Sequence, residues 1–195
     1  DVNATISASL IKGSTAANSQ ISWKNQTYDA LDSAASATVN GQSSFSNLKV
    51  NALVATDYKL HFGVTVGGNS FSVDTSDFAV TPGAATNLGI IREAAQAQSS
   101  KSFGVQPMLR VYDKVGNRVT AANQKPSIAM TVSSGADGYS VDATNDSYDA
   151  GDYSFVGEGL KGLASSDAYD LTFTASGTFS DSVTQKITLA NGDAS

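Results

Sequence analysis

Residues 58–62 read Tyr-Lys-Leu-His-Phe and residues 169–173 read Tyr-Asp-Leu-Thr-Phe, so the same alternating segment occurs twice in this chain of 195 residues. Alternation places the Tyr, Leu and Phe side chains on one face of a β-strand and the polar side chains on the other. The two segments lie about 110 residues apart, which is the length of a domain rather than of a short solenoid repeat. The sequence therefore predicts two β-domains that share a strand pattern.

Two more segments recur at the same spacing. Gly41-Gln-Ser-Ser-Phe45 corresponds to Gly151-Asp-Tyr-Ser-Phe155, and Phe78-Ala-Val80 corresponds to Ile187-Thr-Leu189. In each pair the apolar, polar and turn positions coincide. Three pairs in the same order predict that the chain is a section of a tandem array, an arrangement typical of proteins that provide length, display or adhesion.

Pro82-Gly83 separates the two predicted domains. Residues 83–195 contain about seven short alternating segments with Gly, Asn and Asp turns, which predicts a complete antiparallel β-sandwich. Residues 1–82 predict a partial domain that lacks its first strands, because residue 1 already lies where the second domain has its Ile128 strand. Such a domain exposes apolar side chains and an open sheet edge. A longer polypeptide, or a neighbouring filament subunit that donates strands, would cover them.

The composition favours an all-β fold. β-Branched and turn-forming residues are common, whereas Glu93 and Glu158 are the only glutamates. Asn40-Gly41 lies between alternating segments and predicts a type I′ hairpin turn, since both residues tolerate a positive φ. Gly67-Gly68 predicts another tight turn.

Three regions have weaker patterns. Residues 94–100 are polar and predict a helical turn or a loop. Residues 139–153 are rich in Asp and predict a loop. Residues 179–183 and 187–189 predict two separate strands close to the end of the sequence.

A family resemblance is carried by the motifs Gly-x-x-x-Phe-x-x-Leu, Tyr-x-Leu-x-Phe and Val-x-Pro-Gly-x-Ala. Their residues here are Gly41, Phe45, Leu48, Tyr58, Leu60, Phe62, Val80, Pro82, Gly83 and Ala85. The second domain adds Leu88-Gly-Ile90 and the motif V-x-D-x-x-G-N-x-V over residues 111–119. In these motifs the chain resembles tandem immunoglobulin-like repeats of bacterial surface proteins and adhesins, and distantly filamin-type repeats. The resemblance implies tandem immunoglobulin-like antiparallel β-sandwiches, the first one incomplete at its N-terminus; it does not explain why residues 11–36 are longer than their counterpart.

Charge and composition exclude several classes of function. The formal net charge is −6, and an acidic chain binds phosphate backbones poorly, so no nucleic-acid partner is expected. Cysteine is absent, which removes disulfides and thiolate metal sites. No apolar run approaches the length of a membrane span, so membrane insertion is not expected. The cysteine-free, Ser- and Thr-rich composition is common in exported bacterial proteins and predicts an extracellular or cell-surface location.

An acidic stretch is the candidate metal site. Asp142, Asp146, Asp149 and Asp152 offer the oxygen ligands that Ca²⁺ prefers. Their spacing differs from that of an EF-hand, so a solvated acidic loop is the alternative interpretation. Calcium is the only cofactor that the sequence suggests.

Trp23 and Tyr28 form a candidate ligand platform, because sugar rings stack on exposed aromatic side chains. Burial of Trp23 in the core is the simpler interpretation, since immunoglobulin-like sandwiches commonly bury one tryptophan. His61, the only histidine, is expected to face solvent on the polar side of its strand, and no nucleophile-and-acid motif surrounds it. No catalytic residue is therefore assigned.

Asn3, Asn25 and Asn145 begin Asn-x-Ser/Thr patterns and are candidate glycosylation acceptors in loops that we expect to be exposed. Their number matches chance, so only their positions are informative.

These features predict a non-enzymatic structural segment of an extracellular surface, adhesin or filament protein, acting as a stiff spacer or a filament building block. Its expected partners are neighbouring immunoglobulin-like domains of the same chain or of adjacent subunits. The alternative is a carbohydrate-binding or adhesive module that recognises glycans, supported by calcium.

Overall fold

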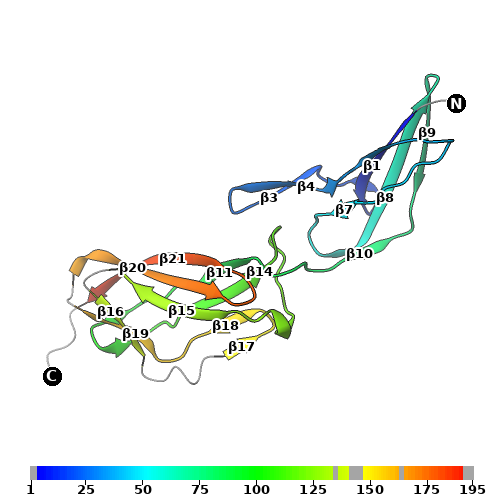
Figure 1. The fold of residues 1–195 in the computed structure, drawn as a ribbon. Helices are drawn as coiled ribbons and strands as arrows, with labels where there is room; N and C mark the ends of the chain where they lie inside the picture. Colours follow the sequence, from blue (N-terminus) through cyan, green and yellow to red (C-terminus); the bar gives the residue numbers. More distant parts are fainter. Residues whose placement is uncertain (1–3, 134–135, 141–146, 163–164, 191–195) are drawn as a thin grey trace. The chain divides into compact units, whose positions relative to one another are not determined.

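The computed structural model describes the chain except for residues 1–3, 134–135, 141–146, 163–164 and 191–195. The chain divides into two compact units, Asp1–Pro82 (unit 1) and Gly83–Ser195 (unit 2). Across the described residues the regular structure is β-strand, apart from a short 3₁₀ turn, η1, at Ala122–Gln124 (Figure 1). The all-β class predicted from composition is confirmed.

Unit 2 contains a pair of stacked sheets, antiparallel except for the short strand β12. Its strands are β11 (Asn87–Arg92), β12 (Ala97–Gln98), β13 (Lys101–Ser102), β14 (Met108–Tyr112), β15 (Ser127–Val132), β16 (Ala136–Ser140), β17 (Ser147–Asp149), β18 (Asp152–Ser154), β19 (Glu158–Gly162), β20 (Ser165–Ser176) and β21 (Asp181–Ala190). One sheet has the order β11-β14-β18-β17, the other β12-β21-β20-β15, and β13-β19-β16 form a third, smaller sheet. When the two-residue strand β12 is left out and the other strands of these two sheets are lettered A to G in chain order, the sheets have the A-B-E-D and C-F-G arrangement of immunoglobulin constant-type domains. Unit 2 is therefore an immunoglobulin-like β-sandwich.

The core of unit 2 lies between these two sheets. Leu88 and Leu109 from one sheet, and Leu171 and Phe173 from the other, are completely inaccessible to solvent. They belong to one continuous apolar cluster. Alternation along each strand directs these side chains inward, as the sequence predicts.

The segment after β11 crosses from the first sheet to the second. Ala94 is buried, and its N–H and C=O bond to the side-chain amide of Gln185 on β21, at 2.9 and 3.0 Å. Three residues later, β12 begins and pairs in parallel with β21. Of the two predictions for residues 94–100, the helical turn is wrong, and the loop is interrupted by β12, because this backbone forms hydrogen bonds with a neighbouring strand.

Two other predictions need correction. Residues 179–183 and 187–189 do not form separate strands, because β21 continues without interruption through the polar residue Gln185, which is buried and bonded to Ala94. The Asp-rich region predicted as a loop contains the β17–β18 hairpin, whose turn has a positive φ at both Ala150 and Gly151.

The turn after β14 is organised by a buried carboxylate. Asp113 Oδ1 accepts hydrogen bonds from the N–H groups of Val115 (3.0 Å) and Asn117 (2.9 Å). Its Oδ2 accepts from the Asn117 side-chain amide (2.9 Å) and from the N–H of Gly83 (3.0 Å). Four hydrogen bonds compensate for burying this charge, so the V-x-D-x-x-G-N-x-V motif forms a tightly bonded turn.

Unit 1 is built on a sheet with the order β10-β8-β1-β2. Its strands are β1 (Thr5–Lys12), β2 (Thr15–Ala16), β3 (Gln20–Trp23), β4 (Gln26–Asp29), β5 (Leu31–Asp32), β6 (Ala35–Ala37), β7 (Lys49–Val50), β8 (Ala55–Val66), β9 (Asn69–Asp74) and β10 (Phe78–Val80). β8 is central, with β1 along one edge and β9 and β10 along the other, while β6 pairs with β1. β3 pairs with β4 and β5 with β7 outside this sheet.

The central strands of the two units have the same register. Phe62 lies opposite Ala8 in the β8–β1 pair, and Phe173 lies opposite Met130 in the β20–β15 pair. β1 therefore corresponds to β15, and β8 corresponds to β20.

The pairing along the other edge of β8 is also equivalent to the pairing along the other edge of β20. Tyr58 lies opposite Phe78, and Tyr169 lies opposite Ile187. These are the residues that the sequence comparison aligned. β9 and β10 together thus occupy the position that β21 occupies in unit 2.

The extra length of residues 11–36 has a structural explanation. Between its first central strand and the Asn40-Gly41 turn, unit 1 contains the β3–β4 hairpin. The hairpin spans about the length by which unit 1 exceeds unit 2 in this region. Asn40 and Gly41 both have a positive φ, as do Gly67 and Gly68, so both predicted turns are confirmed.

Candidate functional site

The predicted aromatic platform lies on the β3–β4 hairpin. Ile21 faces Tyr28 across the hairpin, and Trp23 faces Gln26. Directly opposite residues share a face, so the two aromatic side chains and Ile21 lie on the same side. Trp23 and Tyr28 are half-buried and lie outside the buried core of unit 1, so the interpretation of Trp23 as a core residue is wrong. The cause is that the tryptophan belongs to a hairpin outside the main sheet.

The other face of this hairpin is polar. Gln20 Nε2 donates to Asp29 Oδ1 at 3.0 Å, and the hydroxyls of Ser22 and Thr27 lie 3.1 Å apart. The hairpin is therefore amphipathic, and its aromatic side carries the candidate ligand platform.

The acidic stretch is described only in part. Asp142 and Asp146 lie outside the described residues, whereas Asp149 and Asp152 lie opposite each other in the β17–β18 hairpin. Arg110 binds Asp152 in a bidentate pair, with Nε–Oδ1 2.7 Å and Nη2–Oδ2 2.9 Å. Arg118 Nη2 also lies 2.9 Å from Asp152 Oδ2. Both oxygens of this carboxylate therefore already have cationic partners.

The two arginines lower the pKa of the Asp152 carboxyl group. The hydrogen bond from Arg110 holds the pKa of Asp152 below its usual range, against the opposing effect of burial. Within the described part of the chain, no group of three or more His, Cys, Asp or Glu side chains is placed to hold a metal ion. The calcium set stays a prediction that concerns mainly Asp142, Asp146 and Asp149.

Of the three candidate glycosylation sites, Asn25 lies within the described residues. Asn3 and Asn145 lie outside the described residues. Asn25 is exposed at the tip of the β3–β4 hairpin, where its φ is +61°.

His61 lies on the outer face of β8. Its Nδ1 is 2.6 Å from Asp74 Oδ1 on β9, and the imidazole remains partly exposed. The nearby hydroxyl of Ser7 donates to the carbonyl of Gly63 at 3.3 Å rather than to the imidazole. The histidine thus contributes a cross-strand link, and its outward orientation is as predicted.

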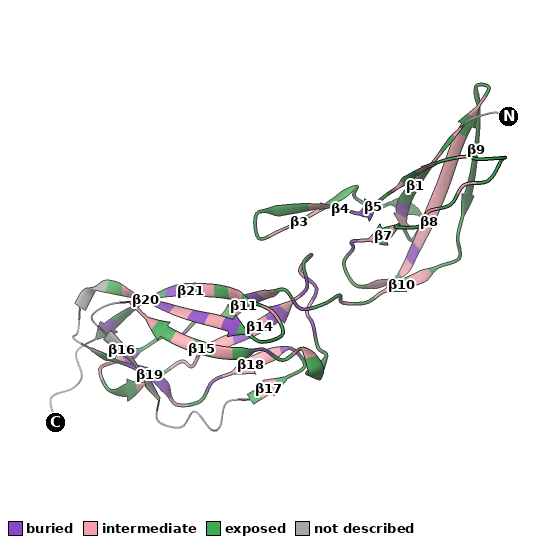
Figure 2. Cartoon of the chain, viewed as in Figure 1, coloured by how far each residue is buried: buried purple, intermediate pink, exposed green. Residues whose placement is uncertain are grey.

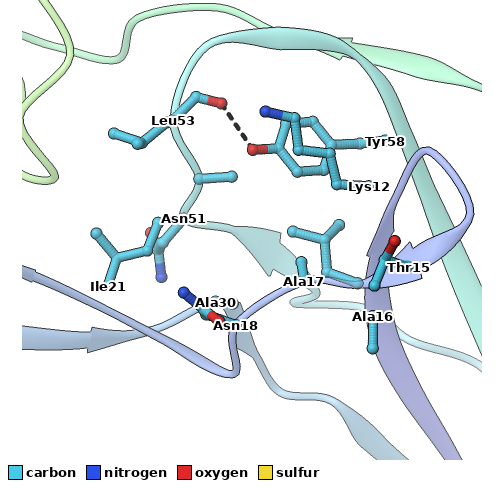
Figure 3. Close-up of a pocket in the computed structure, with 12 residues that line it drawn as sticks. Lys12, Thr15, Ala16, Ala17, Asn18, Ile21, Ala30, Asn51, Leu53 and Tyr58 are labelled. Atoms are coloured by element: carbon cyan, nitrogen blue, oxygen red, sulfur yellow. Dashed lines mark hydrogen bonds between the residues drawn. The ribbon is translucent and has the colours of Figure 1, made fainter.

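A hollow of about 380 Å³ lies in unit 1 between the main sheet and the loop that precedes β8 (Figure 3). Leu10, Ala30 and Ala52 are among the residues that line it, and Lys12 Nζ lies 5.9 Å from the centre of the Tyr58 ring. Tyr58 donates its hydroxyl to the carbonyl of Leu53 at 3.0 Å. Burial raises the pKa of this phenol.

Part of the main sheet of unit 1 is apolar and uncovered. We define the uncovered face as Ile6, Val64, Phe71 and Val73, which alternation and cross-strand pairing place on the core side of β1, β8 and β9. Phe71 is 60% exposed and Val73 is 65% exposed. Figure 2 shows all of β9 as exposed. Sequence reasoning predicted an open apolar face here but did not identify these residues.

Comparisons with known proteins assign this chain to no family. No family model matches the chain, and no curated protein matches it. Two solved structures are similar: a chimeric titin Z1Z2 functionalised with an exogenous decorin peptide (TM-score 0.31, 13% identity, 95% of this chain and 82% of that chain) and titin Z1Z2 in complex with telethonin (0.30, 12%, 96% and 83%). At these scores the likeness carries no argument of its own. No described helix is long and apolar enough to cross a membrane. The immunoglobulin-like assignment follows from the strand order of unit 2.

Proposed function

We propose that this chain is a non-enzymatic structural segment of an extracellular surface, adhesin or filament protein, built from immunoglobulin-like modules in series. It acts as a stiff spacer or a filament building block. Its partners are neighbouring modules of the same polypeptide or of adjacent subunits.

One observation carries this proposal: the two units share an aromatic pair at equivalent positions. The ring centres of Phe45 and Phe62 lie 5.3 Å apart, and those of Phe155 and Phe173 lie 5.4 Å apart. In both units the first phenylalanine follows a positive-φ turn by four residues, and the second lies on the central strand. Repetition of turn, strand register and packed pair supports a module that was duplicated for mechanical or display purposes.

Strand pairing suits a load-bearing role. In unit 2, β20 forms antiparallel ladders with both β15 and β21, so extension along the strands loads many hydrogen bonds together. The acidic exterior, with a net charge of −6, disfavours edge-to-edge association and keeps such a module dispersed outside the cell.

Single-molecule extension of the chain between terminal handles tests this function. Unit 2 should unfold in one cooperative step that lengthens the chain by roughly 35–40 nm, since an extended residue spans about 3.5 Å. Antibodies against unit 2 should label intact cells of the source organism. Gradual extension without a force peak, or labelling only after permeabilisation, would contradict the proposal.

A second candidate function is glycan binding at the β3–β4 hairpin. It is favoured by one observation, the shared aromatic face of Trp23 and Tyr28 outside the core. A glycan array with the native chain and with Trp23→Ala tests it, and Ser22→Ala, on the polar face of the same strand, is the matched control. Binding lost only in Trp23→Ala supports this alternative. Calorimetry with Ca²⁺ and Asp149→Asn tests its calcium-supported form.

A further inference from the structure

We propose that the uncovered face of unit 1 is a receptor for two antiparallel strands with the apolar pattern of β11 and β14, joined to the N-terminal side of β1. The inference rests on the proposed function, because it treats the two units as copies of one module. It goes beyond that function by identifying the partner of unit 1 and the surface that binds it.

Unit 2 shows what covers the corresponding face. β11 and β14 place Leu88, Leu109 and Val111 over the inner side of β20 and β21, and all three are inaccessible to solvent. The N–H of Leu88 donates to Asp181 Oδ2 at 2.7 Å, which fixes β11 against the start of β21. Beneath this layer Ala175 is also fully buried.

The same positions in unit 1 are open. Val64 corresponds to Ala175, because Val64 lies opposite Phe71 as Ala175 lies opposite Asp181. Val64 is only half-buried, and Phe71 is mostly exposed. A carboxylate that caps a strand in unit 2 is thus replaced by a large apolar side chain, which favours an apolar contact with the covering strands.

The segment of unit 1 that corresponds to the pairing partner of β14 belongs to no strand. In unit 2, β14 pairs with β18, placing Leu109 opposite Tyr153. The counterpart of β18 is residues 42–44, which follow the Asn40-Gly41 turn; Gln42 bridges to Val39, and residues 43 and 44 belong to no strand. An added strand could therefore pair here as β14 pairs with β18, and bury the Phe45–Phe62 pair from the second side.

Chain order identifies the source of the strands. In unit 2, β11 and β14 directly precede β15, and β1 is the counterpart of β15. A second copy of the chain is a poorer donor, because its own Leu88, Leu109 and Val111 are fully buried in unit 2. Releasing them would expose that core.

The test extends the full chain at its N-terminus with a second copy of residues 83–122, which gives β1 the same preceding segment that β15 has. We expect slower amide exchange in β8 and β9, weaker binding of an apolar dye, and an increase of at least about 5 °C in the melting temperature of unit 1 followed by Trp23 fluorescence. The matched control has the same extension with Leu88→Asp and Leu109→Asp in the added copy only. It should behave like the unextended chain.

Unchanged exchange in β9 and an unchanged melting temperature would overturn the proposal. If the extended chain is insoluble, the peptide of residues 83–122 is added to the unextended chain, where protection of β9 supports the proposal and its absence overturns it. Sedimentation of the unextended chain tests a second copy as the occupant: a dimer dissociated by Val73→Asp would also overturn it. These readouts do not depend on force resistance, so the proposed mechanical function can fail separately.

Discussion

Units 1 and 2 use the same central strands, yet their cores differ. Phe173 is fully buried between two sheets, whereas its counterpart Phe62 is half-buried on the main sheet of unit 1. Among the residues whose burial is described, large exposed apolar side chains also concentrate in unit 1. They are Val39, Leu53, Val54, Phe71 and Val73, against Ile91 and Val156 in unit 2. The comparison teaches that register and side-chain pattern build a sheet, whereas a core also requires a second layer.

The largest expected effect is at the equivalent phenylalanines. Phe173→Ala should destabilise unit 2 by about 3–5 kcal/mol, because it leaves a cavity in a closed core. Phe62→Ala should cost unit 1 only about 1–2 kcal/mol, since part of that ring already contacts water. Urea unfolding followed by hydrogen exchange in each unit measures both values. Equal losses would show that the two cores are equally closed.

The next largest difference in stability between the units is expected for substitutions at the equivalent turn glycines Gly151 and Gly41. Gly151→Ala should cost about 2–4 kcal/mol, because a Cβ there would overlap the carbonyl oxygen of Val119 in a backbone with φ +91°. Gly41→Ala should cost about 1–2 kcal/mol, from its positive φ alone, since a Cβ there meets no atom within 4 Å. Thermal unfolding of both variants tests this. A Gly41 effect as large as that of Gly151 would mean that unit 1 is packed around its turn as tightly as unit 2.

A substitution in the buried Asp113 turn of unit 2 tests whether the two units unfold independently. Asp113→Ala removes the acceptor of four hydrogen bonds and should destabilise unit 2 by about 2–3 kcal/mol. Exposed Asp149→Ala is the control and should change stability by less than about 0.5 kcal/mol. Trp23 fluorescence reports on unit 1 and should show the same transition in both variants. A shift of that transition in Asp113→Ala would show that the stabilities of the two units are coupled.

The smallest expected effect depends on pH. Because the pKa of Asp152 is lowered in the folded state, its stabilisation is present above the ordinary range of an aspartate, about pH 4, and is lost as the pH falls through the lowered pKa. Asp152→Asn should cost about 1–2 kcal/mol at pH 7 and much less at pH 2. Melting curves from pH 2 to 7 measure the difference. Gln42→Ala, at the equivalent turn position in unit 1, should show no such dependence; a constant Asp152→Asn effect would exclude an ionic cause.

Much of the framework could be read before the structure was known. The Tyr-x-Leu-x-Phe strands and the Asn40-Gly41 turn follow from alternation and backbone preferences, which act over a few residues. The errors arose where a distant group decides the outcome. Gln185 makes residues 94–100 part of a sheet crossing, although nothing in that segment itself indicates it.

The candidate sites also combine features that the local sequence determines with features that distant residues determine. Sequence alone determined that this is an all-β chain with a recurring strand pattern, acidic and free of cysteine, because composition and alternation are local properties. Only the tertiary structure decided that Asp152 is held by two arginines, that Trp23 lies outside the core, and that Phe71 and Val73 face solvent. Ion pairing and burial depend on which strands meet across tens of residues, and that choice is made by packing.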